Sequence, residues 1–367
     1  MKLSLAREVL LKPLQLAAGV VERRQTLPVL ANVLVSAKGG ELSLTGTDLE
    51  VEIRGTVPLP EASDQGAITV PARKLLDICR ALPEGSVVSL VADAEQRVKI
   101  QSGRSRFTLS TLPADEFPEV EQEAGRVEFR VDQGALKRTI DACSFAMAQQ
   151  DVRYYLNGML WEISAGRLRA VATDGHRLAL ADTAIGAAPD KPVQAILPRK
   201  GVTELGRLLG TDGEASVVVG ANHLSVAGPG YRFTTKLVDG AYPDYERVIP
   251  RGGTKVLEGE RELFRQAFAR TAILSNEKYR GVRLDMEPGR LTVAANNPDQ
   301  ETAEEEVAVA YDAERLEVGF NVGYLLDVLN ALSGARVRMV LSDANSSVLL
   351  SDPEGEQALY VIMPMRL

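Results

Sequence analysis

The chain contains one sequence unit three times, and this repeat limits its possible folds more strongly than any other feature. The segment VPARKLLDICRAL at positions 70–82 aligns with LPRKGVTELGRLL at 197–209 and with FNVGYLLDVLNAL at 320–332. The offsets between these segments are 127 and 123 residues. A regular spacing of this kind indicates a structural unit that is repeated along the chain.

A second, independent set of matches keeps the same spacing. Leu42, Leu168 and Leu291 occupy one position in ELSLTGTDLE, RLRAVATDGH and RLTVAANNPD, with offsets of 126 and 123 residues. The segment 106–108 (RFT) also matches 232–234 (RFT), with an offset of 126. The 367 residues therefore form three repeats of about 123 to 127 residues, each close to the usual size of a domain.

Each copy shows the same order of predicted elements. A helical stretch comes first, at Arg7–Val21, Gln133–Met147 and Arg261–Leu274. Alternating strands with glycine turns follow, then a second helix at the aligned segments described above, and then further strands. The strands expected in the first copy include Val33–Ser36, Leu42–Thr45, Val51–Thr56, Val87–Val91, Val98–Gln101 and Phe107–Leu112. Two helices among many strands in each copy predict an α+β fold.

Segments rich in proline and acidic residues join the copies. They run from 117 to 125 and from 243 to 253, and such segments are typical of connections between domains. We expect a first domain at 1–124, a central domain at 125–249 and a C-terminal domain at 250–367.

Composition and charge exclude several classes of protein. No apolar run reaches the roughly 20 residues that a membrane span needs, and Arg7, Glu8 and Lys12 interrupt the N-terminal apolar stretch. Two cysteines, Cys79 and Cys143, are too few for a disulfide framework or a cysteine-rich zinc site. We therefore expect a reduced, cytoplasmic protein without a metal ion. The net charge of −8 argues against a nucleic-acid binder that is basic over its whole surface, but it does not describe local patches.

The second helices of the first two copies carry basic residues at aligned positions. Arg73 and Arg80 fall almost opposite the apolar stripe of their helix, at about 100° per residue. Lys200 and Arg207 occupy the same two positions in the second copy, whereas the third copy has a glycine and an asparagine there. This repetition in an acidic protein favours a cationic track along a phosphate backbone. A solvated helix face is the alternative interpretation.

A second cluster of polar residues follows the first helix of two copies. It comprises ERRQ at 22–25 and QQDVRYY at 149–155. Arginine and tyrosine side chains on a loop suit phosphate contact and base stacking. Each cluster is a weak signal by itself, because tyrosine pairs also occur in ordinary packing.

No motif in the chain indicates an enzyme. The only histidines are His176 and His223, and the chain has neither a phosphate-binding glycine loop nor a nucleophile elbow. The TDGHR cluster at 173–177 resembles a catalytic site, and an enzyme that uses Asp174 and His176 is one alternative function. Its counterpart in the first copy is TD at 47–48, so turn chemistry is the favoured interpretation. A repeat scaffold that does not bind DNA is a second alternative.

Long motifs over the whole chain resemble the bacterial sliding clamps, the beta subunits of DNA polymerase III. The motifs are TLPVLANVL (26–34), LSLTGTDLE (42–50), VPARKLLDICRALPEG (70–85), QDVRYYLNGML (150–160), ATDGHRLA (172–179), KLVDGAYPDYERV (236–248), AILSNEKYRGVRL (272–284), FNVGYLLDVLNAL (320–332) and YVIMPMRL (360–367). The threefold repeat matches the three similarly folded domains of that family.

The resemblance implies a non-catalytic processivity factor that encircles duplex DNA. It implies a head-to-tail homodimer with six repeats in a closed ring, helices lining the hole and sheets outside. The implied partners are primed double-stranded DNA, the replicative polymerase, an ATP-driven clamp loader, and other polymerases and repair proteins that carry short linear motifs. No cofactor and no membrane contact are implied. Basic side chains inside such a ring reconcile DNA binding with an acidic whole.

The resemblance also implies three groups of functional residues. DNA contacts are expected from Arg24, Arg73, Gln150, Tyr154 and Tyr155, to which the basic helix faces add Arg80, Lys200 and Arg207. The dimer contact is expected to involve Phe107 on one edge and Ile273 and Leu274 on the other. The partner-peptide pocket is expected to comprise Leu156, Thr173, Gly175, His176, Arg177, Leu178, Pro243, Arg247, Val248, Asn321, Tyr324, Ser347, Met363, Pro364, Met365, Arg366 and Leu367.

The C-terminal sequence Met-Pro-Met-Arg-Leu supports part of the pocket independently. Methionine is adaptable and suits a groove that binds several partners. The alternation of Val361 and Met363 also fits a final strand packed in its own core.

Overall fold

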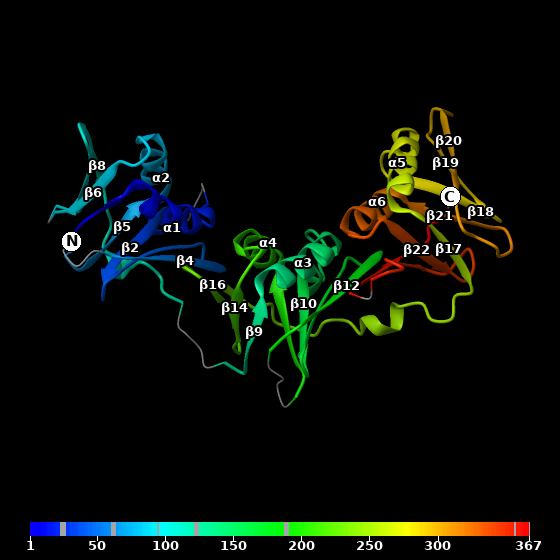
Figure 1. Cartoon of the computed structure of the whole chain (residues 1–367), viewed down its shortest axis with the longest axis horizontal. Coiled ribbons are helices and arrows are strands. Elements are labelled where there is room, and N and C mark those ends of the chain that lie inside the picture. The colour runs from blue at the N-terminus through cyan, green and yellow to red at the C-terminus, as the bar shows by residue number, and fades with distance from the viewer. Residues whose placement is uncertain are drawn as a thin grey trace. The chain divides into compact units, whose positions relative to one another are not determined.

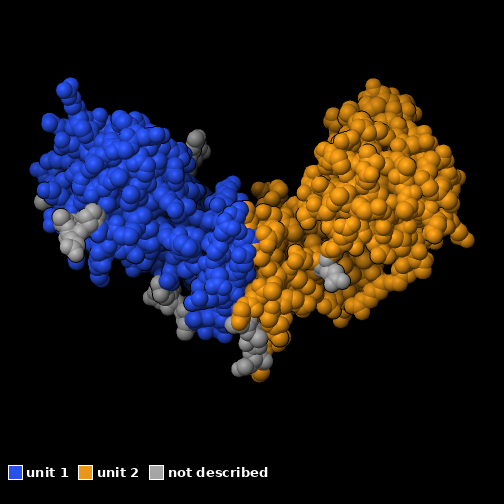
Figure 2. Space-filling view, viewed as in Figure 1, with its two compact units in different colours: residues 1–134, 200–237 blue, residues 135–199, 238–367 orange. Residues whose placement is uncertain are grey.

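The structure is a computed structural model that describes residues 1–22, 27–59, 64–93, 95–120, 125–186, 191–355 and 357–366. The chain forms two compact units. Unit 1 contains residues 1–134 and 200–237, and unit 2 contains residues 135–199 and 238–367 (Figure 2). The first copy of the repeat lies in unit 1 and the third copy lies in unit 2. The second copy is divided between the two units.

Within the described residues, every copy contains two α-helices and eight strands in the same order, besides short 3-10 turns (Figure 1). The first copy comprises β1 Lys2–Ala6, α1 Arg7–Gly19, β2 Asn32–Lys38, β3 Glu41–Thr47, β4 Val51–Pro58, β5 Gly66–Pro71, α2 Ala72–Ala81, β6 Val87–Ala92, β7 Arg97–Ser102 and β8 Ser105–Ser110. The second comprises β9 Val127–Asp132, α3 Gln133–Cys143, β10 Gly158–Ser164, β11 Arg167–Thr173, β12 Arg177–Ala184, β13 Val193–Pro198, α4 Arg199–Leu208, β14 Glu214–Val219, β15 His223–Gly228 and β16 Tyr231–Lys236. The third comprises β17 Lys255–Glu260, α5 Arg261–Thr271, β18 Gly281–Glu287, β19 Arg290–Asn296, β20 Thr302–Ala308, β21 Leu316–Asn321, α6 Val322–Ala331, β22 Arg336–Leu341, β23 Val348–Ser351 and β24 Ala358–Ile362.

The strands of each copy form two antiparallel ladders of four. In the first copy the ladders are β1-β6-β7-β8 and β5-β2-β3-β4, and the other copies repeat this order. Strands β4 and β16 pair in unit 1, and β12 and β24 pair in unit 2, so each unit contains one sheet of eight strands. The ladders that end in β8 and in β20 remain four-stranded.

Apolar side chains of the first helices close the core of each copy. On α1, Leu10, Leu14 and Ala17 are buried at a spacing of four and three residues, which places them on one helix face. They pack with Leu75 and Cys79 of α2 and with inward-facing residues of both ladders. Burial of each leucine contributes roughly 1.5–3 kcal/mol. In unit 2, α5 and α6 lie against each other in the same way, and α5 contacts β19 and β20.

The structure confirms the α+β fold and three clamp-type repeats. It also shows elements that the sequence analysis missed, because strands β1, β9 and β17 directly precede the first helix of each copy. Strand β1 alternates strictly, with Leu3 and Leu5 buried between exposed neighbours. Its five residues continue into α1 without a turn, so the helical period concealed the strand period.

Among the described residues, no helix is long and apolar enough to cross a membrane.

Two glycines permit the close approach of α1 to the sheet. A Cβ atom on Gly46 would lie 2.0 Å from the carbonyl oxygen of Ala17, and one on Gly55 would lie 2.7 Å from the backbone of Pro13. Both neighbours are main-chain atoms of α1, so an added side chain displaces the helix itself.

We predict that Gly46→Ala lowers the free energy of unfolding of unit 1 by about 3 kcal/mol, because the added methyl group overpacks the interface between helix and sheet. Urea denaturation followed by circular dichroism measures the loss. Gly19→Ala is the matched control, since its Cβ would have 4.0 Å to the nearest atom. Equal stability of the two variants would contradict the close approach.

Candidate functional site

Unit 2 contains an apolar pocket next to the β12–β24 junction. Its cavity measures about 170 Å³. The lining residues are Arg153, Leu156, Thr173, Gly175, His176, Arg177, Leu178, Pro243, Asp244, Tyr245, Val248, Val361 and Met363. A buried cluster that includes Leu160, Val171 and Leu180 lies behind it. The lining and this cluster share Leu178, Tyr245 and Val361, so the pocket floor is part of the core of the unit.

The pocket brings together many of the residues predicted for it. Nine of them line the cavity: Leu156, Thr173, Gly175, His176, Arg177, Leu178, Pro243, Val248 and Met363. The others, Arg247, Asn321, Tyr324, Ser347, Pro364, Met365 and Arg366, do not line it, and Leu367 lies outside the described residues. Four further residues line the cavity without having been predicted from the sequence: Arg153, Asp244, Tyr245 and Val361. Each of these is within three positions of a predicted residue, so the only available signal was proximity in sequence.

One wall of the pocket is the tight turn between β11 and β12. Thr173 Oγ1 accepts a hydrogen bond from the Gly175 N–H at 3.1 Å and donates one to the Arg177 carbonyl at 2.6 Å. Asp174 Oδ1 accepts from the N–H groups of His176 and Arg177 at 2.9 and 3.0 Å. Gly175 has φ 90°, a conformation that glycine adopts without strain.

The same turn occurs in the first copy, which favours the structural interpretation of the Thr-Asp pair. There, Thr47 Oγ1 accepts from the Leu49 N–H at 3.1 Å and donates to the Val51 carbonyl at 2.9 Å. Asp48 Oδ1 accepts from the N–H groups of Glu50 and Val51 at 2.9 and 2.8 Å. A carboxylate that is occupied by the backbone in this way holds a turn, and both copies use it alike.

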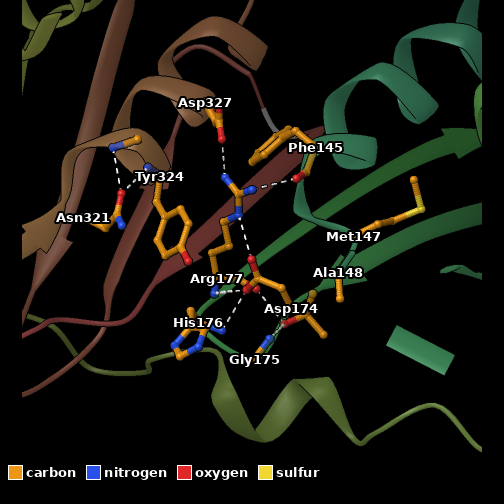
Figure 3. A network of polar contacts seen from close by, with 12 residues as sticks. Phe145, Met147, Ala148, Asp174, Gly175, His176, Arg177, Asn321, Tyr324 and Asp327 are labelled. Carbon is orange, nitrogen blue, oxygen red and sulfur yellow. Dashed lines mark hydrogen bonds and ion pairs between the residues drawn. The ribbon is translucent and has the colours of Figure 1, made fainter. Parts of the chain in front are cut away.

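Arg177 connects this turn to the third copy (Figure 3). Its guanidinium donates to Asp174 Oδ2 at 3.2 Å, to the Phe145 carbonyl at 2.8 Å and to the carboxylate of Asp327 on α6. The same group lies 5.1 Å from the centre of the Phe145 ring and 4.5 Å from that of Tyr324. Two carboxylates and two rings therefore fix one cation, and each ring face favours a positive charge.

Two residues of the third copy lie behind the lining residues His176 and Arg177 without lining the cavity themselves. The ring of Tyr324 stacks on that of His176 with centroids 6.5 Å apart. Asn321 caps α6, since its Oδ1 accepts from the N–H groups of Gly323 and Tyr324 at 2.8 and 3.3 Å. Burial raises the pKa of the Tyr324 hydroxyl. The Met363 N–H donates to the His176 carbonyl at 2.9 Å, which holds the C-terminal segment at the pocket.

The loop before β10 carries the predicted DNA contacts of the second copy. Arg153 binds both carboxylate oxygens of Asp151, at 3.0 and 2.8 Å, and this pairing lowers the pKa of Asp151 to about 2. Gln150 and Tyr154 are exposed, whereas Tyr155 packs against the core cluster behind the pocket. Val152 is 95% exposed. The loop is thus fixed at Asp151 and presents Gln150, Val152 and Tyr154 to solvent.

The basic helix residues of unit 1 fall into two classes. Arg73 and Arg80 of α2 are exposed, and neither guanidinium has an ion-pair partner within the described part of the chain. Lys200 is held between the carboxylates of Glu22 and Asp48. Arg207 pairs with Glu204 at 2.8 Å, and Arg24 lies outside the described residues.

Two arginines of α5 also pair with nearby carboxylates. Arg265 pairs with Glu262 at 2.8 Å, and Arg270 pairs with Glu305 at 2.9 Å.

Of the residues predicted for a dimer, one lies on the edge strand β8, and the other two lie in the 3-10 turn Ala272–Leu274 that follows α5. Phe107 on β8 and Leu274 are partly exposed, and Ile273 is 76% exposed. The residues aligned with Phe107 are Phe233 and Tyr360, and both are completely buried at the internal junctions.

The described residues contain no group of three or more histidine, cysteine, aspartate or glutamate side chains suited to a metal ion. Both cysteines are buried, and burial raises the pKa of Cys79 to about 11.

Comparison with known proteins gives matches over the whole chain. Models of the DNA polymerase III beta subunit match at residues 1–121 for its N-terminal domain, 130–244 for its central domain and 246–366 for its C-terminal domain. The beta sliding clamps of Pseudomonas aeruginosa and Escherichia coli K12 are 56% and 52% identical, each over 100% of both chains. A crystal structure of the Pseudomonas aeruginosa sliding clamp bound to griselimycin has a TM-score of 0.97 and 56% identity, with complete coverage of both chains.

We predict that Thr173→Val opens the β11–β12 turn, because valine keeps the shape of threonine but removes both hydrogen bonds of the hydroxyl. Amide hydrogen exchange followed by mass spectrometry is expected to become about 10-fold faster in peptides that span residues 173–178. Thr47→Val is the matched control and is expected to accelerate exchange only at the equivalent turn of unit 1. Unchanged exchange at residues 173–178 would contradict this account of the turn.

Proposed function

The chain belongs to the DNA polymerase III beta subunit family of sliding clamps, and we propose that two molecules of the protein, each with three copies of the repeat, form a closed ring around duplex DNA. Its function is that of a processivity factor in DNA replication. A ring holds DNA topologically, so its contacts with the phosphates can stay weak and salt-sensitive, which permits sliding. A polymerase tethered to the ring has a raised effective concentration at the primer end.

The observation that carries the ring is the pattern of strand pairing. The last strand of the first ladder in copies two and three pairs with the last strand of the second ladder in the preceding copy, as β16 does with β4 and β24 with β12. The two strands left over, β8 of the first copy and β20 of the third, are the same two kinds of edge. Pairing β8 of one molecule with β20 of a second molecule repeats the internal junction and gives a partner to the last strand of every ladder.

Exposure and charge at these edges support that pairing. The internal junctions place Phe233 opposite Ile53 and Tyr360 opposite Ala179. If β8 of one molecule pairs with β20 of a second molecule in the register of the internal junctions, Phe107 lies opposite Ala303 of the second molecule. The same register places Arg106 opposite Glu304, so a basic β8 meets an acidic β20.

The ring assigns the basic residues different roles. We propose that Arg73 and Arg80 contact the phosphate backbone, together with Arg24 and the exposed Gln150 and Tyr154 of the loop before β10. Lys200, Arg207 and Tyr155 contribute less, because the two cations are engaged by carboxylates and the tyrosine packs in the core.

The apolar pocket of unit 2 suits short linear motifs of partner proteins. Its lining offers Leu156, Leu178, Val361 and Met363, and its walls are fixed by backbone hydrogen bonds. We propose that the polymerase, an ATP-driven loader and repair proteins bind there in the cytoplasm.

We also propose that the boundaries between the three domains of the chain lie near residues 124 and 249.

Retention on circular DNA tests the clamp function. After incubation with an active clamp loader and ATP, the protein is expected to co-elute with closed circular DNA in gel filtration and to be released when the circle is linearised. Equal retention on circular and linear DNA would mean ordinary surface binding and would refute the ring. No retention on either form, with a loader that is active on another clamp, would favour a scaffold.

The same assay compares the basic residues. Arg73→Glu combined with Arg80→Glu is expected to reduce loading about 10-fold at moderate salt, because two phosphate contacts become repulsive. Lys200→Met serves as the comparison and is expected to retain most of the loading. A larger effect of Lys200→Met would overturn the assignment.

A charge exchange tests the proposed dimer register. Arg106→Glu or Glu304→Arg alone is expected to weaken the dimer by about 10-fold, because like charges then face each other across the interface. The double variant is expected to recover most of the loss. Analytical ultracentrifugation measures dimer dissociation, and Arg130→Glu on an exposed part of β9 is the control. Failure of the double variant to recover would argue for a different register.

A further inference from the structure

Asp327 contacts the pocket only through another residue. It lies on α6, it does not line the cavity, and its side chain is 44% exposed. Its carboxylate pairs with the guanidinium of Arg177, which does line the cavity (Figure 3). The pair therefore joins a helix of the third copy to a turn of the second.

Each of the three nitrogen atoms of the Arg177 guanidinium donates a hydrogen bond. It donates to Asp174, Asp327 and the Phe145 carbonyl, and it lies between the rings of Phe145 and Tyr324. Only 12% of the side chain is exposed. The charge is thus directed away from the cavity, and what Arg177 offers a ligand is chiefly its apolar carbon chain.

We propose that Asp327 is a positioning residue for ligand binding in the pocket, because it holds Arg177 in the place where its carbon chain forms the pocket wall. The proposal rests on the pocket being the partner-binding site of this clamp. Asp327 acts from outside the cavity, so it tunes the affinity for an apolar peptide without touching the peptide.

The contacts of Asp174 explain why a second carboxylate is needed. Asp174 Oδ1 is already occupied by the backbone of His176 and Arg177, and Oδ2 accepts from Arg177 Nε. Without Asp327, the other end of the guanidinium keeps only the Phe145 carbonyl and the ring faces. A part-buried cation that loses a charged partner rearranges toward water or toward its remaining partner. Either movement displaces the carbon chain from the pocket wall.

The rings beside Arg177 extend the effect across the pocket. Tyr324 precedes Asp327 by one helical turn on α6, and it contacts both the guanidinium and the ring of His176. His176 and Arg177 are neighbouring lining residues. Asp327 therefore stabilises one arrangement in which α6, Tyr324, His176 and Arg177 are fixed together. A ligand that binds this arrangement has a higher affinity, because the arrangement is already formed before the ligand binds.

Griselimycin provides the probe, because a crystal structure shows it bound to the sliding clamp of Pseudomonas aeruginosa. With immobilised full-length protein and surface plasmon resonance, Asp327→Asn is expected to weaken griselimycin binding about 3- to 10-fold, mainly through faster dissociation. Asp327→Glu keeps the carboxylate and is expected to recover most of the affinity. Glu262→Gln removes an exposed carboxylate that pairs with Arg265 on α5 of the same unit, and it is expected to leave the affinity unchanged.

A double-mutant cycle separates positioning from general destabilisation. If Asp327 acts through Arg177, Asp327→Asn is expected to have little further effect in an Arg177→Lys background. Additive losses in the cycle, or wild-type affinity of Asp327→Asn, would overturn the positioning role. The lining variant Met363→Asp is expected to abolish griselimycin binding. If it binds griselimycin as tightly as the wild-type protein, the ligand binds elsewhere and the pocket assignment fails instead. Thermal unfolding of each variant identifies any variant that does not fold. If one does not fold, the griselimycin affinities of Asp327→Glu and of the folded members of the double-mutant cycle test the positioning role.

Discussion

Main-chain pairing across the copy boundaries is the constraint on which the rest of the structure depends. Each ladder of four strands ends in a row of backbone N–H and C=O groups that need partners. Strands β16 and β24 supply them to β4 and β12, and the two sheets of eight strands follow from this pairing. The same requirement, applied to β8 and β20, supports the proposed ring, because pairing with a second molecule gives both strands the kind of partner that β16 and β12 have inside the chain.

The pocket is a consequence of one of these junctions. Pairing of β12 with β24 brings Leu178 opposite Val361, and both line the cavity. The turn that starts β12 then lies next to α6, where Arg177 finds Asp327. A binding surface between two copies of a repeat has side chains that neither copy has by itself. The other internal junction has a different cavity, of about 250 Å³, whose lining includes Glu52 and Arg54 of β4 and Arg232 of β16. The side chains at each junction, and not the strand pairing, therefore make the pocket of unit 2 apolar.

Several cations on the helices pair with nearby carboxylates. Lys200, Arg207, Arg265 and Arg270 each pair with a carboxylate. Surface pairs of this kind contribute little stability, about 0–1 kcal/mol each, but they reduce the charge available to a polyanion. Fewer cations of this acidic chain are therefore available to contact phosphates. Few contacts give weak binding to DNA, which a sliding clamp requires.

The sequence by itself determined the threefold repeat, the helices, most strands and the Thr-Asp turns. These features depend on local periodicity and on side chains that bond to their own backbone, and both are readable within a few residues. The pocket residues, such as Leu156, His176 and Leu178, were predicted from the family resemblance. The sequence around them contains no motif that indicates a binding site. Only the tertiary structure decided that Lys200 is held by Glu22 and Asp48, and that Asp327 supports Arg177 from 150 positions away. Such pairs depend on which strands meet, and strand pairing across copies leaves no periodic signal in either segment.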